Sequence, residues 1–122
     1  MEREMQQQIE KLLEDIVTDY RNWQSKCVDA RGKDGYSDVQ NEMYAEFKEA
    51  LGFREGSKYI KITKNNGGSV WGFIVNTDND KKFRKGDILK PAGYNAPARN
   101  AARGNILDGG YCIQWTGPLY LN

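Results

Sequence analysis

The residues best suited to binding chemistry lie together between positions 91 and 105, in a stretch rich in arginine, asparagine, glycine and alanine. Its two arginines, Arg99 and Arg103, are four positions apart. We expect Ala98–Arg103 to form about one and a half helical turns, which would place both guanidinium groups on one face. Two guanidinium groups on one face can hold two phosphates at once. The spacing therefore predicts a structured loop that binds an anion and carries Arg103 at its surface.

The same stretch offers groups that recognise a nucleotide. Tyr94 supplies a ring for stacking on a base, and the asparagines supply amides of the sort that read an adenine edge. Gly93 and Gly104 let backbone N–H groups approach a ligand closely. The alternative is a surface loop whose arginines pair within the fold. The candidate ligand-binding residues are Arg103, Ala98, Arg99, Asn95, Tyr94, Asn100, Asn105 and Phe73.

The absence of histidine restricts the chemistry of this chain. It removes Ser-His-Asp and Cys-His catalysis and histidine-zinc sites together. Cys27 and Cys112 belong to no C-x-x-C pair, so we expect two reduced, buried thiols. Asp78 and Asp80 resemble the start of a calcium loop but lack its glycine and distal glutamate, which favours a solvated turn. We predict that the protein is not an enzyme and uses no metal or cofactor.

Charge is divided unequally along the chain. Residues 1–56 carry eight Lys/Arg and thirteen Asp/Glu, whereas residues 57–122 carry ten and four. The basic half is therefore expected to bind a phosphate-bearing ligand. The acidic half is expected to face solvent or to contact a neighbouring basic surface. A merely solvated, mixed-charge surface is the alternative. The basic run from Lys81 to Lys85 either binds a phosphate backbone or prevents another strand from pairing with the edge of the sheet.

The first half of the chain has the pattern of two helices. Apolar residues recur every three or four positions from Met5 to Cys27, which predicts one amphipathic helix of about 25 residues. Its apolar stripe is either core or a dimer seam. Ser37 and Gln40 form a capping box, so a second helix is expected from there to about Leu51. No apolar leader or 18-residue apolar stretch occurs, which favours a cytoplasmic protein without membrane contact.

The second half has the two-residue period of strands. Tyr59–Lys64 and Val70–Val75 are separated by Asn65–Gly68, whose Asn-Gly pair predicts a β-hairpin. Trp71, Phe73 and Trp115 lie in strand patterns that favour the core over ligand stacking. Shorter strands are expected at Ile88–Lys90, Tyr111–Trp115 and Pro118–Leu121.

The predicted fold class is α+β, with two N-terminal helices, one of them long, followed by a small antiparallel β-sheet. We expect a single domain over residues 1–122, in which residues 1–52 form a helical layer. Residues 57–122 then form a β-rich, ligand-binding part.

Several segments of the C-terminal half resemble a family of small phage proteins, the first-described Thoeris anti-defence sponges. These segments are Ser69–Phe73, Lys85–Ala92, Asn95–Asn105 and Trp115–Pro118. The resemblance implies a protein that sequesters the cyclic ADP-ribose isomer made by bacterial TIR-domain enzymes and does not degrade it. It implies a homo-oligomer, a dimer or a hexamer, and capture of cyclic di- or trinucleotides by related members. It also implies a ligand held at a protomer interface and lined by Arg103 and Ala98.

Together these features predict a phage anti-defence protein that acts in the cytoplasm of the bacterial host cell. Two other functions stay open. One is a single-stranded nucleic-acid binder that stacks bases on Tyr59, Tyr94 and Trp115. The other is an interaction protein that docks on a host factor and presents an exposed apolar patch.

Overall fold

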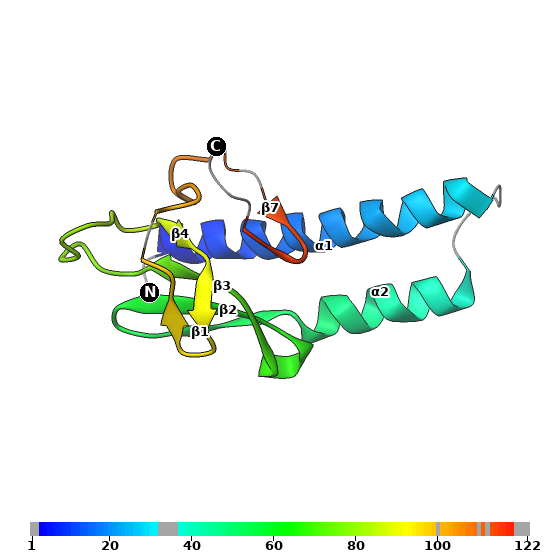
Figure 1. Ribbon diagram of the computed structural model, residues 1–122, viewed down its shortest axis with the longest axis horizontal. Coiled ribbons are helices and arrows are strands. Elements are labelled where there is room, and N and C mark those ends of the chain that lie inside the picture. The colour runs from blue at the N-terminus through cyan, green and yellow to red at the C-terminus, as the bar shows by residue number, and fades with distance from the viewer. Residues whose placement is uncertain (1–2, 32–36, 100, 110, 112, 119–122) are drawn as a thin grey trace.

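The computed structural model describes residues 3–31, 37–99, 101–109, 111 and 113–118. Two helices, α1 (Arg3–Arg31) and α2 (Asp38–Ala50), run antiparallel to each other (Figure 1). The main antiparallel sheet follows, with strand order β1 (Gly52–Glu55), β2 (Tyr59–Lys64), β3 (Ser69–Val75) and β4 (Ile88–Leu89). Two smaller sheets pair β5 (Pro91–Gly93) with β6 (Ala96–Pro97) and β7 (Ile113–Gln114) with β8 (Gly117–Pro118). The predicted α+β class is confirmed.

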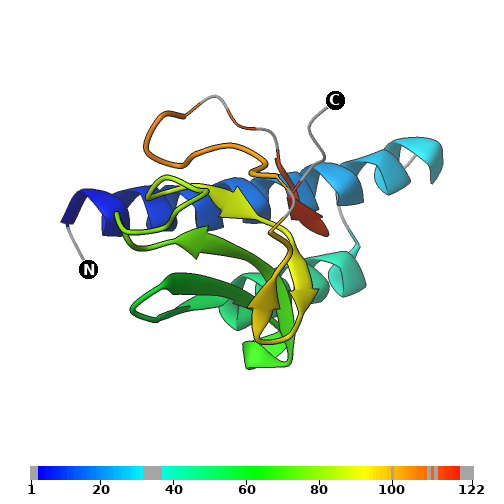
Figure 2. The same cartoon turned by 60° about the vertical axis from the view of Figure 1, so that its left-hand side comes forward.

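The apolar stripe of α1 is the centre of the core. Its residues recur at helical spacing and are almost completely covered; they are Met5, Ile9, Leu12 and Ile16. They pack on Ile60, Ile62 and Ile74 of the main sheet. Figures 1 and 2 show the sheet beside the N-terminal half of α1, while the helices extend together beyond it. The stripe is therefore core within one chain.

The helical pair is joined by polar groups. Ser37 Oγ accepts a hydrogen bond from Gln40 N at 3.1 Å, and Gln40 Oε1 accepts one from Ser37 N at 2.9 Å. This confirms the predicted capping box. The side chain of Gln24 is buried on α1, and its Nε2 donates to the Gln40 carbonyl oxygen at 2.7 Å. That bond satisfies a buried amide and fixes the start of α2 against α1.

The β2–β3 hairpin is confirmed, and its turn is a short 3₁₀ helix, η1 (Asn65–Gly67). Asn65, Asn66 and Gly67 all have positive φ values, of 54°, 55° and 90°. Asparagine and glycine tolerate this region better than other residues, which explains the sequence of the turn. The first strand, β1, was not predicted from the sequence.

A β-bulge at Trp71 decides which residues of β3 face α1. Ile62 pairs with Gly72 and Thr63 pairs with Val70, so Trp71 is an extra residue in β3. Because of it, Trp71 joins the α1 side of the core, while Phe73 and Val75 face the opposite side. The indole Nε1 of Trp71 donates to the Gln114 carbonyl oxygen at 2.8 Å and ties β7 to the sheet.

The opposite side of the sheet has its own apolar cluster. Phe73, Val75, Phe83 and Leu89 are buried there, and Ala102 packs against them. The segments after β3 and after β6 therefore cover this side of the sheet.

The C-terminal part of the chain returns to α1. Trp115 N donates to Asp19 Oδ2 at 2.8 Å, across 96 positions of sequence. Of the predicted strand Pro118–Leu121, Pro118 lies in β8, and residues 119–122 lie outside the described residues. The side chain of Cys27 and the whole of Cys112 lie outside them as well. No described helix is long and apolar enough to cross a bilayer.

Truncation of Ile16 tests the role of the α1 stripe. Ile16 is fully buried, so Ile16→Ala should lower the free energy of unfolding by about 2–5 kcal/mol, measured by urea denaturation. Lys11→Ala, at an exposed position of the same helix, should change it by less than about 0.5 kcal/mol. Equal effects for the two variants would contradict this packing.

Candidate anion-binding site

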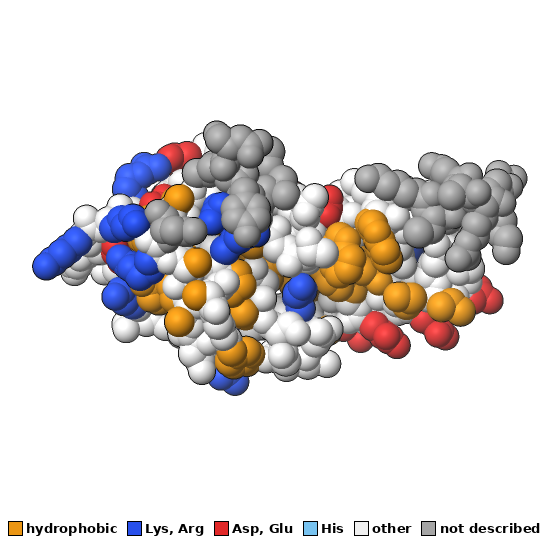
Figure 3. All heavy atoms as spheres, in the orientation of Figure 1, with side chains coloured by type: hydrophobic (Ala, Val, Ile, Leu, Met, Phe, Trp, Pro, Cys, Tyr) orange, Lys and Arg blue, Asp and Glu red, His pale blue; other side chains and the backbone are white. Residues whose placement is uncertain are grey.

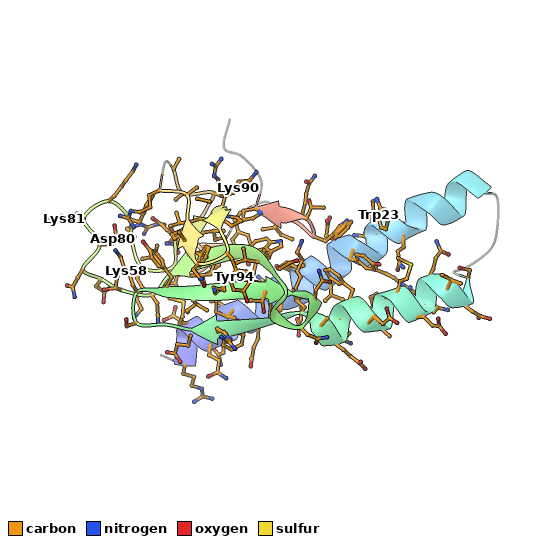
Figure 4. All side chains as sticks on the ribbon, turned by 60° about the horizontal axis from the view of Figure 1, so that its bottom comes forward. Trp23, Lys58, Asp80, Lys81, Lys90 and Tyr94 are labelled. Atoms are coloured by element: carbon orange, nitrogen blue, oxygen red, sulfur yellow. The ribbon has the colours of Figure 1, made fainter. Side chains whose placement is uncertain are left out.

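A pocket of about 510 Å³ lies at one end of the main sheet. Lys58 comes from the loop before β2, Asp80 and Lys81 from the loop after β3, and Arg99 from the segment after β6. Figure 4 shows Lys58, Asp80 and Lys81 close together at this end. Three cations against one carboxylate give the pocket a formal charge of +2. The remaining lining residues are Ser57, Thr77 and Asn79.

A bidentate ion pair organises the pocket. Arg99 Nη1 donates to Asp80 Oδ2 and Arg99 Nη2 donates to Asp80 Oδ1, both at 2.9 Å. Arg99 also donates to the Tyr59 hydroxyl, and its guanidinium carbon lies 5.0 Å from the centroid of the Phe83 ring. The Asp80 side chain is 1% exposed, whereas that of Arg99 is 38% exposed. The guanidinium group is thus held in a fixed plane and still reaches solvent.

Asp80 is held as a carboxylate by several donors. Its pKa lies well below the ordinary value because Arg99 donates to it and because the backbone N–H groups of Lys82 and Phe83 donate to it. The same pair raises the pKa of Arg99. Lys82 Nζ donates to the Arg99 carbonyl oxygen at 2.6 Å. An anion that binds in this pocket has to share Arg99 with Asp80.

The predicted helical turn over Ala98–Arg103 is wrong. Ala98, Arg99 and the described residues that follow are not helical, because the backbone pairs with the sheet instead. Ala98 N donates to the Lys90 carbonyl oxygen and Arg103 N donates to the Ile88 carbonyl oxygen, both at 2.7 Å. Extended pairing of this kind prevents the two arginines from sharing one helix face.

The prediction that Arg103 is exposed is also wrong. Arg103 is only 6% exposed, while Arg99 reaches the pocket. Gly104 adopts a φ of 144°, and a Cβ there would lie 2.6 Å from the Tyr111 Cβ. Position 104 therefore requires a glycine because of its packing against Tyr111, and not because of a ligand.

Asn105 and Phe73 serve the fold. Asn105 Nδ2 donates to Asp87 Oδ1 at 2.9 Å and to the Lys85 carbonyl oxygen at 3.0 Å, and its Oδ1 accepts from Leu107 N at 2.8 Å. This buried amide satisfies a buried carboxylate. Phe73 is buried in the cluster opposite α1 and does not line the pocket. Asn100 lies outside the described residues.

Tyr94 and Asn95 form a separate polar surface at the turn between β5 and β6. Lys61 Nζ lies 4.0 Å from the centroid of the Tyr94 ring and 2.6 Å from Asn95 Oδ1. The Tyr94 hydroxyl donates to the Gly67 carbonyl oxygen. Figure 4 places Tyr94 along the sheet, well away from Lys81. Of the predicted ligand-binding residues that the structure describes, only Arg99 lines the pocket.

Sequence reasoning missed two of the residues that form the pocket. Lys58 follows a Gly-Ser pair just before β2 and has no motif around it. Asp80 was interpreted as a solvated turn residue, although an acid inside a tract of lysines and arginines is a signal for an internal ion pair. The Asp80 side chain is covered by the protein and is not exposed to solvent as that interpretation required.

Comparison with known protein families gives a match over nearly the whole chain. A family described as a family of unknown function (DUF7717) matches residues 1–121. No curated protein and no solved structure matches the chain. Among the described residues, no group of three or more Cys, Asp or Glu side chains is placed to hold a metal ion.

Asn105→Ala tests whether this amide supports the fold. Removing it leaves the buried Asp87 carboxylate without its amide donor, so the free energy of unfolding should fall by about 2–3 kcal/mol. Asn95→Ala, at an exposed asparagine, is the matched control and should cost less than about 0.5 kcal/mol. Thermal and urea unfolding measure both. An Asn105→Ala protein of unchanged stability would show that the amide is free for another role.

Asp80→Asn tests the ion pair in the pocket. Loss of the carboxylate raises the formal charge of the pocket by one, so inorganic pyrophosphate should bind about five-fold more tightly by calorimetry. The depressed pKa of Asp80 means that its carboxylate stabilises the fold above pH about 4, and that this contribution is lost as the pH falls. The stability difference between wild type and Asp80→Asn should therefore shrink from pH 7 to pH 3.

Asp78→Asn is the control, because Asp78 is an exposed neighbour that does not line the pocket. It should change neither pyrophosphate binding nor the pH dependence of stability. Equal gains in affinity for both variants would show that only the overall charge matters.

Proposed function

The chain belongs to DUF7717, a family of unknown function, and we propose that it binds a small, phosphate-bearing nucleotide without transforming it. The observation that carries the proposal is the pocket formed by Lys58, Lys81 and Arg99 around one carboxylate. Its volume of about 510 Å³ falls within the range of small-molecule sites. The Arg99 guanidinium is held in a fixed plane and can share its charge between Asp80 and a phosphate, and the lysines add charge.

Binding without turnover fits the residues that the chain carries. The sequence contains no histidine, the usual general acid or base near neutral pH. The pocket offers hydroxyl groups on Ser57 and Thr77, and its carboxylate, Asp80, is already engaged by Arg99. A carboxylate with a strongly lowered pKa is a poor proton acceptor at neutral pH. A binding protein is therefore the better proposal than an enzyme.

A cyclic ADP-ribose isomer is the ligand that we propose. This part of the proposal rests on the resemblance to the Thoeris anti-defence sponges, and it places the protein in the cytoplasm of a bacterial host cell. A pyrophosphate in such a ligand matches the excess of two positive charges in the pocket. Because Arg103 is buried, we propose Arg99 rather than Arg103 as the arginine that meets the ligand.

Assembly of two or more copies would complete such a site. The pocket lies at the surface, and tight binding of a small polar ligand requires that most of the ligand be enclosed. We propose that a second protomer closes the pocket in a dimer or a hexamer. Cyclic di- and trinucleotides are the further ligands that this proposal includes.

A second candidate function is binding of single-stranded nucleic acid. The exposed cations Lys82 and Arg84 continue from the pocket along the loop after β3, and Figure 3 shows Lys and Arg side chains gathered at this end. Arg84 forms an ion pair with Asp108, and the row of exposed cations beside the pocket suits a phosphate backbone. Salt distinguishes the two functions, because affinity for a long polyanion falls steeply as salt rises.

Calorimetric titration with the cyclic ADP-ribose isomers made by TIR-domain enzymes tests the proposal. Tight binding is expected, and heating the complex should release an intact ligand, detected by chromatography. Arg99→Gln and Lys81→Gln should each weaken binding about 10- to 100-fold, because each removes a charge-assisted hydrogen bond. Arg54→Gln, at an exposed position on β1 outside the pocket, should bind normally.

Three outcomes would overturn the proposal. They are no binding of any isomer, a chemically altered product after release, or equal binding by wild type and Arg99→Gln. A titration with a single-stranded oligonucleotide at 50 and 200 mM salt accompanies these measurements. Binding of the oligonucleotide alone, with steep salt dependence, would support the second function.

A further inference from the structure

A groove of about 600 Å³ lies between the helical pair and the turns that follow β2 and β7. It differs in character from the basic pocket, because four of its ten lining residues are aromatic. Tyr20 and Trp23 come from α1, Met43 and Phe47 from α2, and Trp115 from the β7–β8 turn. Figure 3 shows hydrophobic side chains gathered over the helical pair, with acidic side chains next to them.

The floor of the groove is a rigid set of rings. Tyr20 and Phe47 are stacked, with centroids 4.2 Å apart and an interplanar angle of 3°. Trp115 meets both edge-on, at 5.1 Å from Tyr20 and 5.9 Å from Phe47. Offset-stacked and edge-to-face contacts of this kind are favourable and define ring positions. The floor is thus preorganised to receive an apolar side chain.

The walls of the groove expose two large apolar side chains. Trp23 on α1 is 43% exposed and Met43 on α2 is 44% exposed. The described structure buries no side chain of α2 completely. Tryptophan and methionine are enriched where proteins bind one another, because they offer a large or adaptable contact surface.

Acidic residues border the same groove. Glu46 and Glu49 line it, and with Asp38 and Glu42 they form an exposed stripe at spacings of four, four and three along α2. Residues at these spacings share one face of a helix. Lys64 faces the rings, with its Nζ 5.9 Å from the Trp115 centroid. Carboxylates therefore outnumber the facing cation along this border.

We infer that the groove is a docking site for a basic segment of a partner protein. An apolar side chain of that segment would fill the space between Trp23 and Met43, above the ring floor. Its lysines or arginines would pair with the acidic stripe of α2, which supplies the charge complementarity that orients the partner. A symmetric contact between two copies through this groove would instead bring the glutamates of one copy near those of the other, which is unfavourable.

Selection from a random library of 12-residue peptides on the immobilised full-length chain tests this inference. The enriched peptides should carry a net positive charge and at least one large apolar residue. Synthetic representatives should change the fluorescence of Trp23 and Trp115 and bind with micromolar affinity. The double variant Glu46→Lys/Glu49→Lys should weaken this binding at least ten-fold, and Met43→Glu should weaken it as well by placing a charge in the apolar space.

A matched control separates the groove from general electrostatics. Glu4→Lys/Glu10→Lys makes the same change of charge at exposed positions near the other end of α1 and should leave peptide binding within two-fold of wild type. Arg99→Gln should likewise leave it unchanged, so failure here is distinct from failure of nucleotide binding. Circular dichroism verifies that each variant is folded.

Several results would overturn the inference. These are no enriched peptides, enriched peptides without a basic bias, or equal loss of binding in the matched control. Analytical ultracentrifugation adds a further test. A wild-type oligomer that Met43→Glu converts to a monomer would identify a second copy of the chain as the occupant of the groove.

Discussion

Burial of one face of α1 is the constraint on which the rest of the structure depends. The main sheet has four strands, and its apolar inner face has to be buried against another element. Met5, Ile9, Leu12 and Ile16 supply that cover, and Ile106 brings the C-terminal segment to the same core. The bulge at Trp71 adapts β3 to this contact by adding an indole to the helix side without changing the side on which Phe73 lies.

The two ends of the molecule expose surfaces of opposite charge. At the sheet end, Arg99 and its neighbours are exposed cations around one satisfied carboxylate. At the helical end, α2 exposes acids and the apolar side chains of Val39 and Met43. The unequal division of charge in the sequence is thus a division in space as well (Figure 3). The two ligands that we propose, which differ in charge, would therefore bind at separate ends.

The features that sequence analysis predicted correctly are those decided by near neighbours. The Ser37 capping box spans three positions, and the reversal of the β2–β3 hairpin follows from residues that tolerate positive φ. The features that it missed depend on distant partners. Arg103 is buried because its backbone pairs with β4, and Asp80 is covered because it meets an arginine nineteen positions away. The bulge at Trp71 likewise arises from strand pairing and leaves no mark on the alternation of apolar residues.

The hydrogen bond between Trp115 and Asp19 bears on how the chain is assembled during synthesis. The middle of α1 is made early, but the group that closes over it emerges 96 residues later. Strands β2 and β3, which cover the N-terminal part of the apolar stripe, are made well before this group, but Tyr20 lacks its contact with Trp115 until then. Contacts that span so much sequence form late and slowly, since the intervening loop must close first. A nascent chain stalled before this turn would expose the Tyr20 part of α1 to chaperones or to other nascent chains.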